Sequence, residues 1–472
     1  MNRYLIPSSR MILVLPLLVL SACTTTRTAK EGTTVIEAVP VETAPEPQMP
    51  LFYPDHEVAD VTEIPQKLDE LAAAAGNQLK IEPACRDNLL REFRSRYFAP
   101  WTATHSLYDR ADTIESMRQL EHHTWFGVNL RRVDPKWLHE LIDSCNLGSF
   151  PSRSDLAIAV APGHLRGLPT SLPLFDSRDG FPFDMLEYPQ LKLNEPLRVV
   201  HATRDGVWLF VETPYSNGWI QARDVALVDH GFADTWMKQP LAVLVHDQVP
   251  ITDGYQLRFH AKLGTLFPVV QESPDSIQVT VAGAGDEAKA RSAVVTLARK
   301  DARSFPVEFT AETVAAVGNQ MMGEPYGWGE MYGLRDCSAL LRDFFLPFGI
   351  WLPRTSSDQI ASFPKTVPLA GRTPEEKRQI IRRDGKPFLS ILHKTGHIML
   401  YVGTDSKGRD LVLHDAWSVP VKRGEGQREK MIGKVVITTL EPGKELGLLS
   451  GRSLVDRISE MGTITDRCGG KR

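Results

Sequence analysis

The sequence predicts a multidomain protein in which a helical N-terminal region is followed by two small all-β barrels and a C-terminal α+β domain. The chain has 472 residues, whereas one hydrophobic core rarely serves more than roughly 250. Apolar residues recur at helical spacing up to about residue 150, and then in short runs typical of strands up to about residue 300. The last third mixes both patterns, which indicates a separate α+β domain.

The overall composition excludes some classes of protein. Hydrophobic residues make up 42% of the chain and charged residues 24%, as in ordinary globular domains, so neither a fibrous nor a wholly disordered chain is expected. The formal net charge is −4, which provides no general attraction for DNA or RNA. We therefore expect no nucleic-acid partner.

The N-terminus has the layout of a secretory signal peptide over residues 1–22. Arg3 precedes an apolar run, residues 11–20, that is too short to span a bilayer. The run ends in Leu20-Ser21-Ala22-Cys23, which resembles the lipobox of bacterial lipoproteins. This resemblance implies cleavage before Cys23, lipid modification of Cys23 and a membrane anchor, and Thr24, which is not Asp, favours the outer membrane facing the periplasm. The alternative is a plain secreted protein.

The next two segments are expected to form a tether and a helical domain. Residues 23–50 are rich in Thr, Pro, Glu and Val and cannot bury enough surface to offset the entropy of ordering. Within residues 51–154, three stretches place apolar residues every three or four positions, which predicts helices. These stretches are Ile64–Ala74, Cys85–Tyr97 and Pro135–Cys145.

Two small barrels are expected over residues 155–232 and 233–305. In the first, β-prone runs flank Asp205-Gly206, a dipeptide that favours a hairpin turn. The second barrel shows the same pattern of short β-prone runs less clearly. The runs are Leu197–His201, Val207–Val211 and Gly218–Ile220 in the first barrel, and Leu241–Val245, Ala261–Val270 and Ile277–Val281 in the second.

Cys337 is the candidate nucleophile of the expected C-terminal domain, residues 306–465. A glycine-rich stretch, Gly323–Gly329, precedes it, and a helical pattern follows it. This places the thiol near a helix N-terminus, where free amides and the helix dipole lower a thiol pKa and can bind an oxyanion. Without the surrounding motif, a lone cysteine before Ala-Leu-Leu is more often a small core residue.

Two histidines are candidates for the base and its orienting partner. His397 and His414 lie in β-prone runs joined by a polar turn, residues 404–410, which predicts an antiparallel hairpin. Positions 397 and 414 are symmetric about the turn, so the two imidazoles are expected directly opposite each other on one face. We predict that His397 deprotonates Cys337 and that His414 orients His397. In a shifted register His414 is an unrelated strand residue, and His393 is a weaker competitor for the base.

Four phrases of the last third resemble the NlpC/P60 family of cysteine peptidases. They are Pro325–Gly329, Asp336-Cys337-Ser338, Phe348–Gln359 and Gly396-His397. The resemblance covers about residues 309–440 and implies a papain-like α+β fold. The earlier phrase Asp205–Thr213 is similar to the bacterial SH3 domains that accompany such enzymes, so both barrels are expected to be SH3-like.

The resemblance also implies an activity. SH3-bearing lipoproteins of this family resemble γ-D-glutamyl-L-diamino acid endopeptidases, which cleave L-Ala-γ-D-Glu-meso-diaminopimelate peptides of peptidoglycan. It implies hydrolysis of stem peptides with a free N-terminal L-Ala, without a metal or cofactor, and substrate contacts from Tyr326, Asp336 and Ser338. Arg354 is a candidate for binding a substrate carboxylate, with a structural ion pair as the alternative.

Two positions depart from the family pattern. Glu330 and Ala339 stand where the family often has glycine. Alanine suits a helix at least as well, and a loop glutamate matters only where its backbone needs a positive φ.

Two other functions remain open. One is a peptidoglycan-binding lipoprotein whose peptidase fold is inactive or regulatory, and the other is an N-acetylmuramoyl-L-alanine amidase or a related acyltransferase. An endopeptidase releases L-Ala-D-Glu, whereas an amidase releases whole stem peptides.

The remaining cysteines suggest one disulfide and no metal site. Cys85 and Cys145 fall in one N-terminal segment and are the natural pair in an oxidising compartment, which leaves Cys337 and Cys468 apart. The alternative is that the first two are buried and reduced. His122-His123 lacks a matching carboxylate or cysteine pattern, so we predict no zinc site.

Overall fold

The computed structural model describes residues 57–253, 258–423, 426–448 and 451–468. The predicted signal peptide, Cys23 and the tether lie outside these residues. The described residues fall in one compact unit of the chain. In these ranges no helix has the length and hydropathy needed to cross a bilayer.

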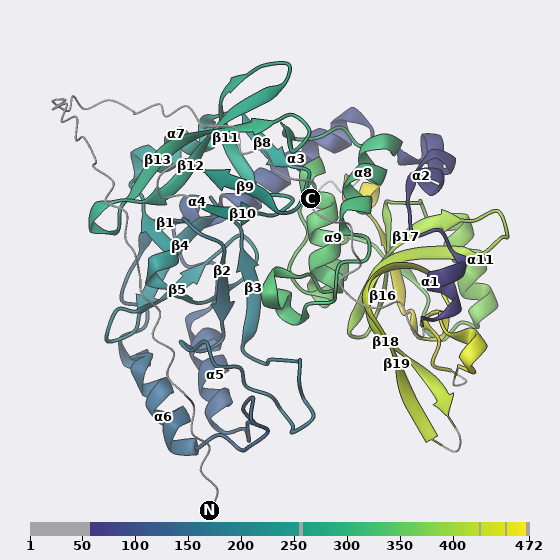
Figure 1. The fold of residues 1–472 in the computed structure, drawn as a ribbon, viewed down its shortest axis with the longest axis horizontal. Helices are drawn as coiled ribbons and strands as arrows, with labels where there is room; N and C mark the ends of the chain where they lie inside the picture. Colours follow the sequence, from purple (N-terminus) through teal and green to yellow (C-terminus); the bar gives the residue numbers. More distant parts are fainter. Residues whose placement is uncertain (1–56, 254–257, 424–425, 449–450, 469–472) are drawn as a thin grey trace, which may run out of the picture. The chain divides into compact units, whose positions relative to one another are not determined.

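The N-terminal region is helical, as predicted (Figure 1). Of the first predicted stretch, Ile64–Ala74, the residues from Asp69 onward are helical, and Pro65 disfavours helical backbone at Ile64 before it. Asp109 and Asp134 cap two of the helices by accepting backbone N–H groups. The helices are α1 (Ala59–Glu63), α2 (Asp69–Ala75), α3 (Pro83–Tyr97), α4 (Ala99–Thr102), α5 (Arg110–Glu121) and α6 (Pro135–Ser144).

These helices contribute to different hydrophobic cores. Leu68 and Ala72 pack in the core of the C-terminal domain, whereas Met117 and Leu138 pack with Trp219 of the first barrel. The apolar faces of the N-terminal helices are therefore buried against the C-terminal domain and the first barrel.

The first barrel is a seven-stranded antiparallel sheet in the order β3-β2-β6-β5-β4-β1-β7. The predicted hairpin at Asp205-Gly206 joins β4 to β5, and Gly206 supplies the positive φ of 71° that the turn needs. The strands are β1 (Asp155–Ala159), β2 (Gly163–Arg166), β3 (Glu187–Leu191), β4 (Pro196–Ala202), β5 (Trp208–Glu212), β6 (Asn217–Gln221) and β7 (Val225–Leu227).

The second barrel follows helix α7 (His230–Lys238) and contains a five-stranded sheet in the order β13-β12-β11-β8-β14 beside the two-stranded pair β10-β9. Its core is aliphatic around Phe267, which is fully buried. The strands are β8 (Leu241–Leu244), β9 (Val249–Thr252), β10 (Arg258–Ala261), β11 (Leu266–Glu272), β12 (Ser276–Ala284), β13 (Ala290–Ala298) and β14 (Ala302–Ser304).

The C-terminal domain combines helices with an antiparallel six-stranded sheet in the order β15-β20-β16-β17-β18-β19. Helix α9 (Cys337–Phe345) packs against β17 and β18, and all nine of its residues are buried. The other elements are α8 (Ala311–Met321), α10 (Ser356–Ala361), β15 (Val367–Pro368), α11 (Pro374–Asp384), β16 (Ser390–Lys394), β17 (His397–Thr404), β18 (Asp410–Arg423), β19 (Gly426–Thr439), α12 (Leu454–Arg457) and β20 (Glu460–Thr463).

The disulfide differs from the predicted pairing. Cys85 of α3 is bonded to Cys468, 383 residues away, and Cys145 is a buried free thiol in the core beside the first barrel. The prediction was wrong because it used closeness in sequence, whereas the fold brings the C-terminal segment against α3. The bond ties the N-terminal region to the end of the C-terminal domain.

Candidate active site

Cys337 is the first residue of α9, and 8% of its surface is exposed. The Asp336 side chain caps this helix by accepting the N–H groups of Ser338 at 3.1 Å and Ala339 at 2.8 Å. These two amides are therefore occupied by a carboxylate of the protein and cannot stabilise a thiolate. Ser338 and Ala339 therefore do not supply the free amides that we expected at this helix start.

Burial favours the protonated thiol of Cys337. Burial raises its pKa to about 12, and the charge of Asp336 acts in the same direction, while the backbone N–H of Ile398 opposes them. The prediction of a lowered thiol pKa was therefore wrong, since desolvation outweighs the helix dipole here. A neighbouring base has to remove the proton during the reaction.

The two predicted histidines are in contact. His397 Nε2 lies 2.8 Å from His414 Nδ1, and His414 Nε2 lies 2.9 Å from the hydroxyl of Thr438 on β19. The register differs from the prediction by two residues, because Leu400 pairs with Leu413, whereas the predicted register pairs it with Leu411. The histidines are thus diagonal neighbours, but a shift of two residues keeps both on the same face.

This chain of contacts defines the tautomers. The Thr438 hydroxyl donates to the carbonyl of Thr439 at 2.8 Å, so it accepts from His414 Nε2–H. His414 Nδ1 then accepts from His397 Nε2–H. The nitrogen left without a proton on His397 is Nδ1, which is the atom able to act as a base.

Both imidazoles are neutral. Burial lowers the pKa of His414 to about 3, and burial together with His414 lowers the pKa of His397 well below its usual value. His414 is 1% exposed, whereas His397 keeps part of its surface open to solvent. His393 is mostly buried, burial lowers its pKa, and its Nδ1 lies 3.6 Å from Glu460 and not against His414, so it is a structural residue of β16 and not the base.

Arg354 is engaged by the protein itself. Its guanidinium binds both carboxylate oxygens of Asp336, at 3.1 and 2.6 Å, and the hydroxyl of Ser338 at 2.9 Å. These groups lie next to Cys337 and hold the capping carboxylate in place. The structure thus favours the structural ion pair over the binding of a substrate carboxylate.

Glu330 is a residue whose importance the sequence did not reveal. Its backbone has a φ of 77°, and its side chain is completely buried, with Arg342 bound bidentately at 2.8 and 2.9 Å. Arg354 Nε lies 2.8 Å away without hydrogen-bond geometry, so that contact is electrostatic only. Burial by itself raises the pKa of Glu330, but Arg342 and Arg354 lower it to about 2. The departure from glycine therefore places a buried charge behind the site.

Asp415 is a second residue that the sequence analysis missed. It is fully buried, and neither carboxylate oxygen has a hydrogen-bond partner among the described residues. Burial, followed by the charges of Glu324 and Asp336, raises its pKa well above the usual range. Asp415 lies close enough to Cys337 for its carboxylate charge to raise the pKa of that thiol. Its position directly after His414 was the only available signal.

An aromatic cluster borders Tyr326. The ring centroids of Tyr326 and Trp417 lie 5.5 Å apart, and those of Trp417 and Phe183 lie 5.2 Å apart. Phe183 belongs to the loop before β3 of the first barrel. Phe183 also contacts Trp328 at 5.1 Å. Electrostatic coupling with Cys337 places the Tyr326 hydroxyl near the nucleophile, although burial is the main reason that its pKa is raised. The barrel thus contributes a side chain to the surroundings of the site.

Of the predicted site residues, Cys337, Tyr326, Asp336, Ser338, Arg354, His397 and His414 all lie in this one region. Cys23 lies outside the described residues. No group of three or more His, Cys, Asp or Glu side chains in the described part of the chain could hold a metal ion.

Comparison with known protein families assigns four segments of the chain to known domain types. Residues 12–150 match the NLPC_P60 stabilising domain, residues 173–221 an SH3 domain of the SH3b1 type, residues 229–274 an SH3 domain of the SH3b2 type, and residues 323–430 the NlpC/P60 family. The predicted fold class, a helical N-terminal region with two SH3-like domains and an NlpC/P60 α+β domain, is confirmed. None of the curated proteins compared with the chain matches it.

Solved structures share the fold. An NlpC/P60 endopeptidase from Photobacterium damselae subsp. piscicida superposes with a TM-score of 0.76 at 21% identity, covering 85% of this chain and 97% of that one. An NlpC/P60 family protein from Bacillus cereus gives a TM-score of 0.41 at 16% identity, covering 59% and 83%, which is too weak for further argument. The four matched segments follow one another in the order of an N-terminal stabilising domain, two SH3 domains and a peptidase domain, so the chain carries an NlpC/P60 peptidase domain behind these accessory domains.

Proposed function

We propose that this protein is a cysteine endopeptidase that hydrolyses the γ-D-glutamyl-meso-diaminopimelate bond of peptidoglycan stem peptides with a free N-terminal L-Ala. The observation that carries the proposal is the hydrogen-bonded series His397–His414–Thr438 beside the buried thiol of Cys337. A base oriented by a second group and placed near a nucleophile is the arrangement of covalent hydrolases. The similar structure from Photobacterium is also described as an endopeptidase.

The reaction begins from neutral partners. His397 Nδ1 accepts the proton of Cys337 as the sulfur attacks the carbonyl carbon of the γ-glutamyl amide, because the high thiol pKa disfavours a preformed thiolate. The imidazolium then protonates the leaving amine, which departs with the diaminopimelate portion. His414 accepts a hydrogen bond from His397 throughout and keeps its imidazole in the productive orientation. Water finally hydrolyses the thioester on Cys337.

The acidic groups near Cys337 suit a free amino terminus. Asp336 shares its carboxylate with Arg354, while Asp415 has no hydrogen-bond partner among the described residues. An ammonium group entering beside Asp415 would favour its charged form and provide the missing partner. This chemistry supports the preference for peptides that begin with a free L-Ala.

The N-terminal pattern supports a location beside the wall. We propose that lipid on Cys23 anchors the protein to the outer membrane, facing the periplasm. The anchor would hold the peptidase next to its peptidoglycan-derived substrate.

Mass spectrometry of reaction products tests the bond specificity. Protein lacking residues 1–23 is incubated with L-Ala-γ-D-Glu-meso-diaminopimelate and separately with intact muropeptides. Release of L-Ala-D-Glu from the tripeptide supports the proposal, and release of whole stem peptides from muropeptides supports an amidase. No cleavage of either by folded, reduced protein supports the binding function.

A further inference from the structure

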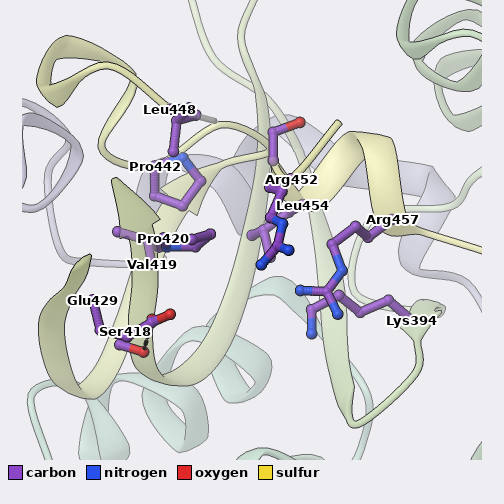
Figure 2. A pocket seen from close by; sticks show the side chains of 11 residues that line it. Lys394, Ser418, Val419, Pro420, Glu429, Pro442, Leu448, Arg452, Leu454 and Arg457 are labelled. Carbon is purple, nitrogen blue, oxygen red and sulfur yellow. Dashed lines mark hydrogen bonds between the residues drawn. The ribbon is translucent and has the colours of Figure 1, made fainter. Parts of the chain in front are cut away.

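A pocket of about 210 Å³ lies between the end of β16, the β18–β19 hairpin and α12 (Figure 2). Three of its lining residues are cations, Lys394, Arg452 and Arg457. Lys394 is partly buried, and the two arginines are exposed. The pocket therefore concentrates positive charge in a concave surface of the peptidase domain.

These cations lack a counter-ion in the described part of the chain. Among the described residues no carboxylate forms an ion pair with any of the three, and the hydrogen bond of Lys394 Nζ within these residues goes to the carbonyl of Thr395, at 3.4 Å. By contrast, Arg378 and Arg382 of α11 are each paired with a carboxylate at 2.6–2.7 Å. Burial and the charge of Arg457 lower the pKa of Lys394 to about 8, because both disfavour the protonated form of the lysine amine.

The opposite side of the pocket carries one carboxylate. Glu429 accepts a hydrogen bond from Ser418 at 2.6 Å, and Figure 2 shows both across the pocket from Lys394 and Arg457. Val419, Pro420 and Leu454 supply apolar surface. The pocket thus offers a cationic side and an anionic side joined by apolar residues, which matches a zwitterionic head group on an alkyl chain.

One residue of the pocket lies next to the proposed catalytic histidine. Lys394 is the cross-strand partner of His397, and its charge is felt by both His397 and Cys337. Since His397 protonates the leaving amine in the proposed reaction, the leaving portion has to lie next to this histidine.

We propose that this pocket binds the distal amino-acid end of the leaving diaminopimelate, with its carboxylate on Arg457, Lys394 and Arg452 and its ammonium toward Glu429. The inference rests on the proposed function and names the residues that select the diamino acid. Lysine at the same position of a stem peptide carries the distal ammonium but no distal carboxylate. The pocket would therefore discriminate between the two.

Steady-state kinetics on two peptides tests the pocket. Arg457→Gln is compared with the unchanged protein on L-Ala-γ-D-Glu-meso-diaminopimelate and on L-Ala-γ-D-Glu-L-Lys. On the first peptide we expect kcat/KM to fall about tenfold, mainly through KM, which is the effect of losing one charge-assisted hydrogen bond. On the second peptide we expect kcat/KM to fall less than about twofold, because that bond is not made. Lys407→Gln, which removes a cation from the turn at the other end of β17, should change neither. Equal losses on both peptides would overturn the inference.

A binding measurement separates this inference from the proposed activity. If neither peptide is cleaved, the proposed function has failed, and calorimetry with free meso-diaminopimelate on the Cys337→Ala protein decides the pocket. Saturable binding that weakens about tenfold with Arg457→Gln supports the pocket. Unchanged binding in that variant, or no saturation up to about 10 mM, overturns it.

Discussion

Replacing Glu330 by glutamine tests whether its buried charge stabilises the peptidase domain. Glutamine keeps the length of the side chain but leaves two guanidinium groups, Arg342 and Arg354, without one of their carboxylates. Breaking a buried ion pair by removing one partner costs about 3–5 kcal/mol. Arg342 keeps Asp343 at 2.9 Å, and Arg354 keeps Asp336 at 2.6 Å, so we expect the lower end, about 3 kcal/mol.

Glu330→Gly separates charge from backbone strain. Glycine adopts the positive φ of 77° without the cost of about 1–2 kcal/mol that an L side chain carries there. This variant also loses the ion pairs and empties the fully buried space of the side chain, and because such a cavity costs about 2–5 kcal/mol against about 1–2 kcal/mol of relieved strain, it should be less stable than Glu330→Gln.

Thermal unfolding followed by tryptophan fluorescence measures both variants. For a domain of this size, 1 kcal/mol shifts Tm by about 2–4 °C, so Glu330→Gln should lower Tm by about 6–12 °C. Asp384→Asn, which breaks an exposed pair with Arg383, is the control and should leave Tm unchanged. A shift of less than about 2 °C for Glu330→Gln would refute the stabilising role of this carboxylate.

Three further predictions follow from the site and the disulfide. Thr438→Val should lower kcat roughly fivefold to tenfold with little change in KM, because it removes the hydroxyl that accepts a hydrogen bond from His414. Thr438→Ser keeps this hydroxyl and should restore kcat. A change confined to KM would contradict this role of Thr438. Thiol labelling of unreduced, unfolded protein that begins after residue 23 should detect two free thiols, Cys145 and Cys337, and four would contradict the Cys85–Cys468 bond. The pKa of His414 is about 3 in the folded protein and about 6.5 in the unfolded protein. Between these pH values only the unfolded state binds a proton on His414. The free energy of unfolding should therefore fall as the pH drops below about 6.5, by up to about 1.4 kcal/mol per pH unit. Denaturation midpoints of the unchanged protein and His414→Gln between pH 7 and 5 should therefore converge, and parallel curves would contradict the shift.

Sequence patterns predicted those features that depend on local periodicity or on family motifs. The helices around Cys85–Tyr97 and Pro135–Cys145 formed close to the predicted bounds, and the contact between His397 and His414 was predicted from the turn between them. The exact register was missed because Thr404 pairs with Asp410, which centres the turn at Lys407 and not between positions 405 and 406, and the alternating pattern does not fix the centre of a polar turn.

Features that depend on tertiary neighbours were not predictable. The Cys85–Cys468 bond joins opposite ends of the chain, and nothing in their local sequence distinguishes this pairing from others. The raised pKa of Cys337 arises from burial by several elements, and the occupied helix amides reflect the Asp336 cap. Glu330 was noted as a departure from glycine, but only the structure shows its positive φ and its two arginine partners.

The most direct test of the central claim compares the two free cysteines. Cleavage of L-Ala-γ-D-Glu-meso-diaminopimelate is followed for the unchanged protein, Cys337→Ala and Cys145→Ala. Because Cys337 lies beside the histidine pair and Cys145 is buried in the core beside the first barrel, we predict that only Cys337→Ala abolishes release of L-Ala-D-Glu. Cleavage that persists in folded Cys337→Ala protein would contradict the assignment of Cys337 as the nucleophile.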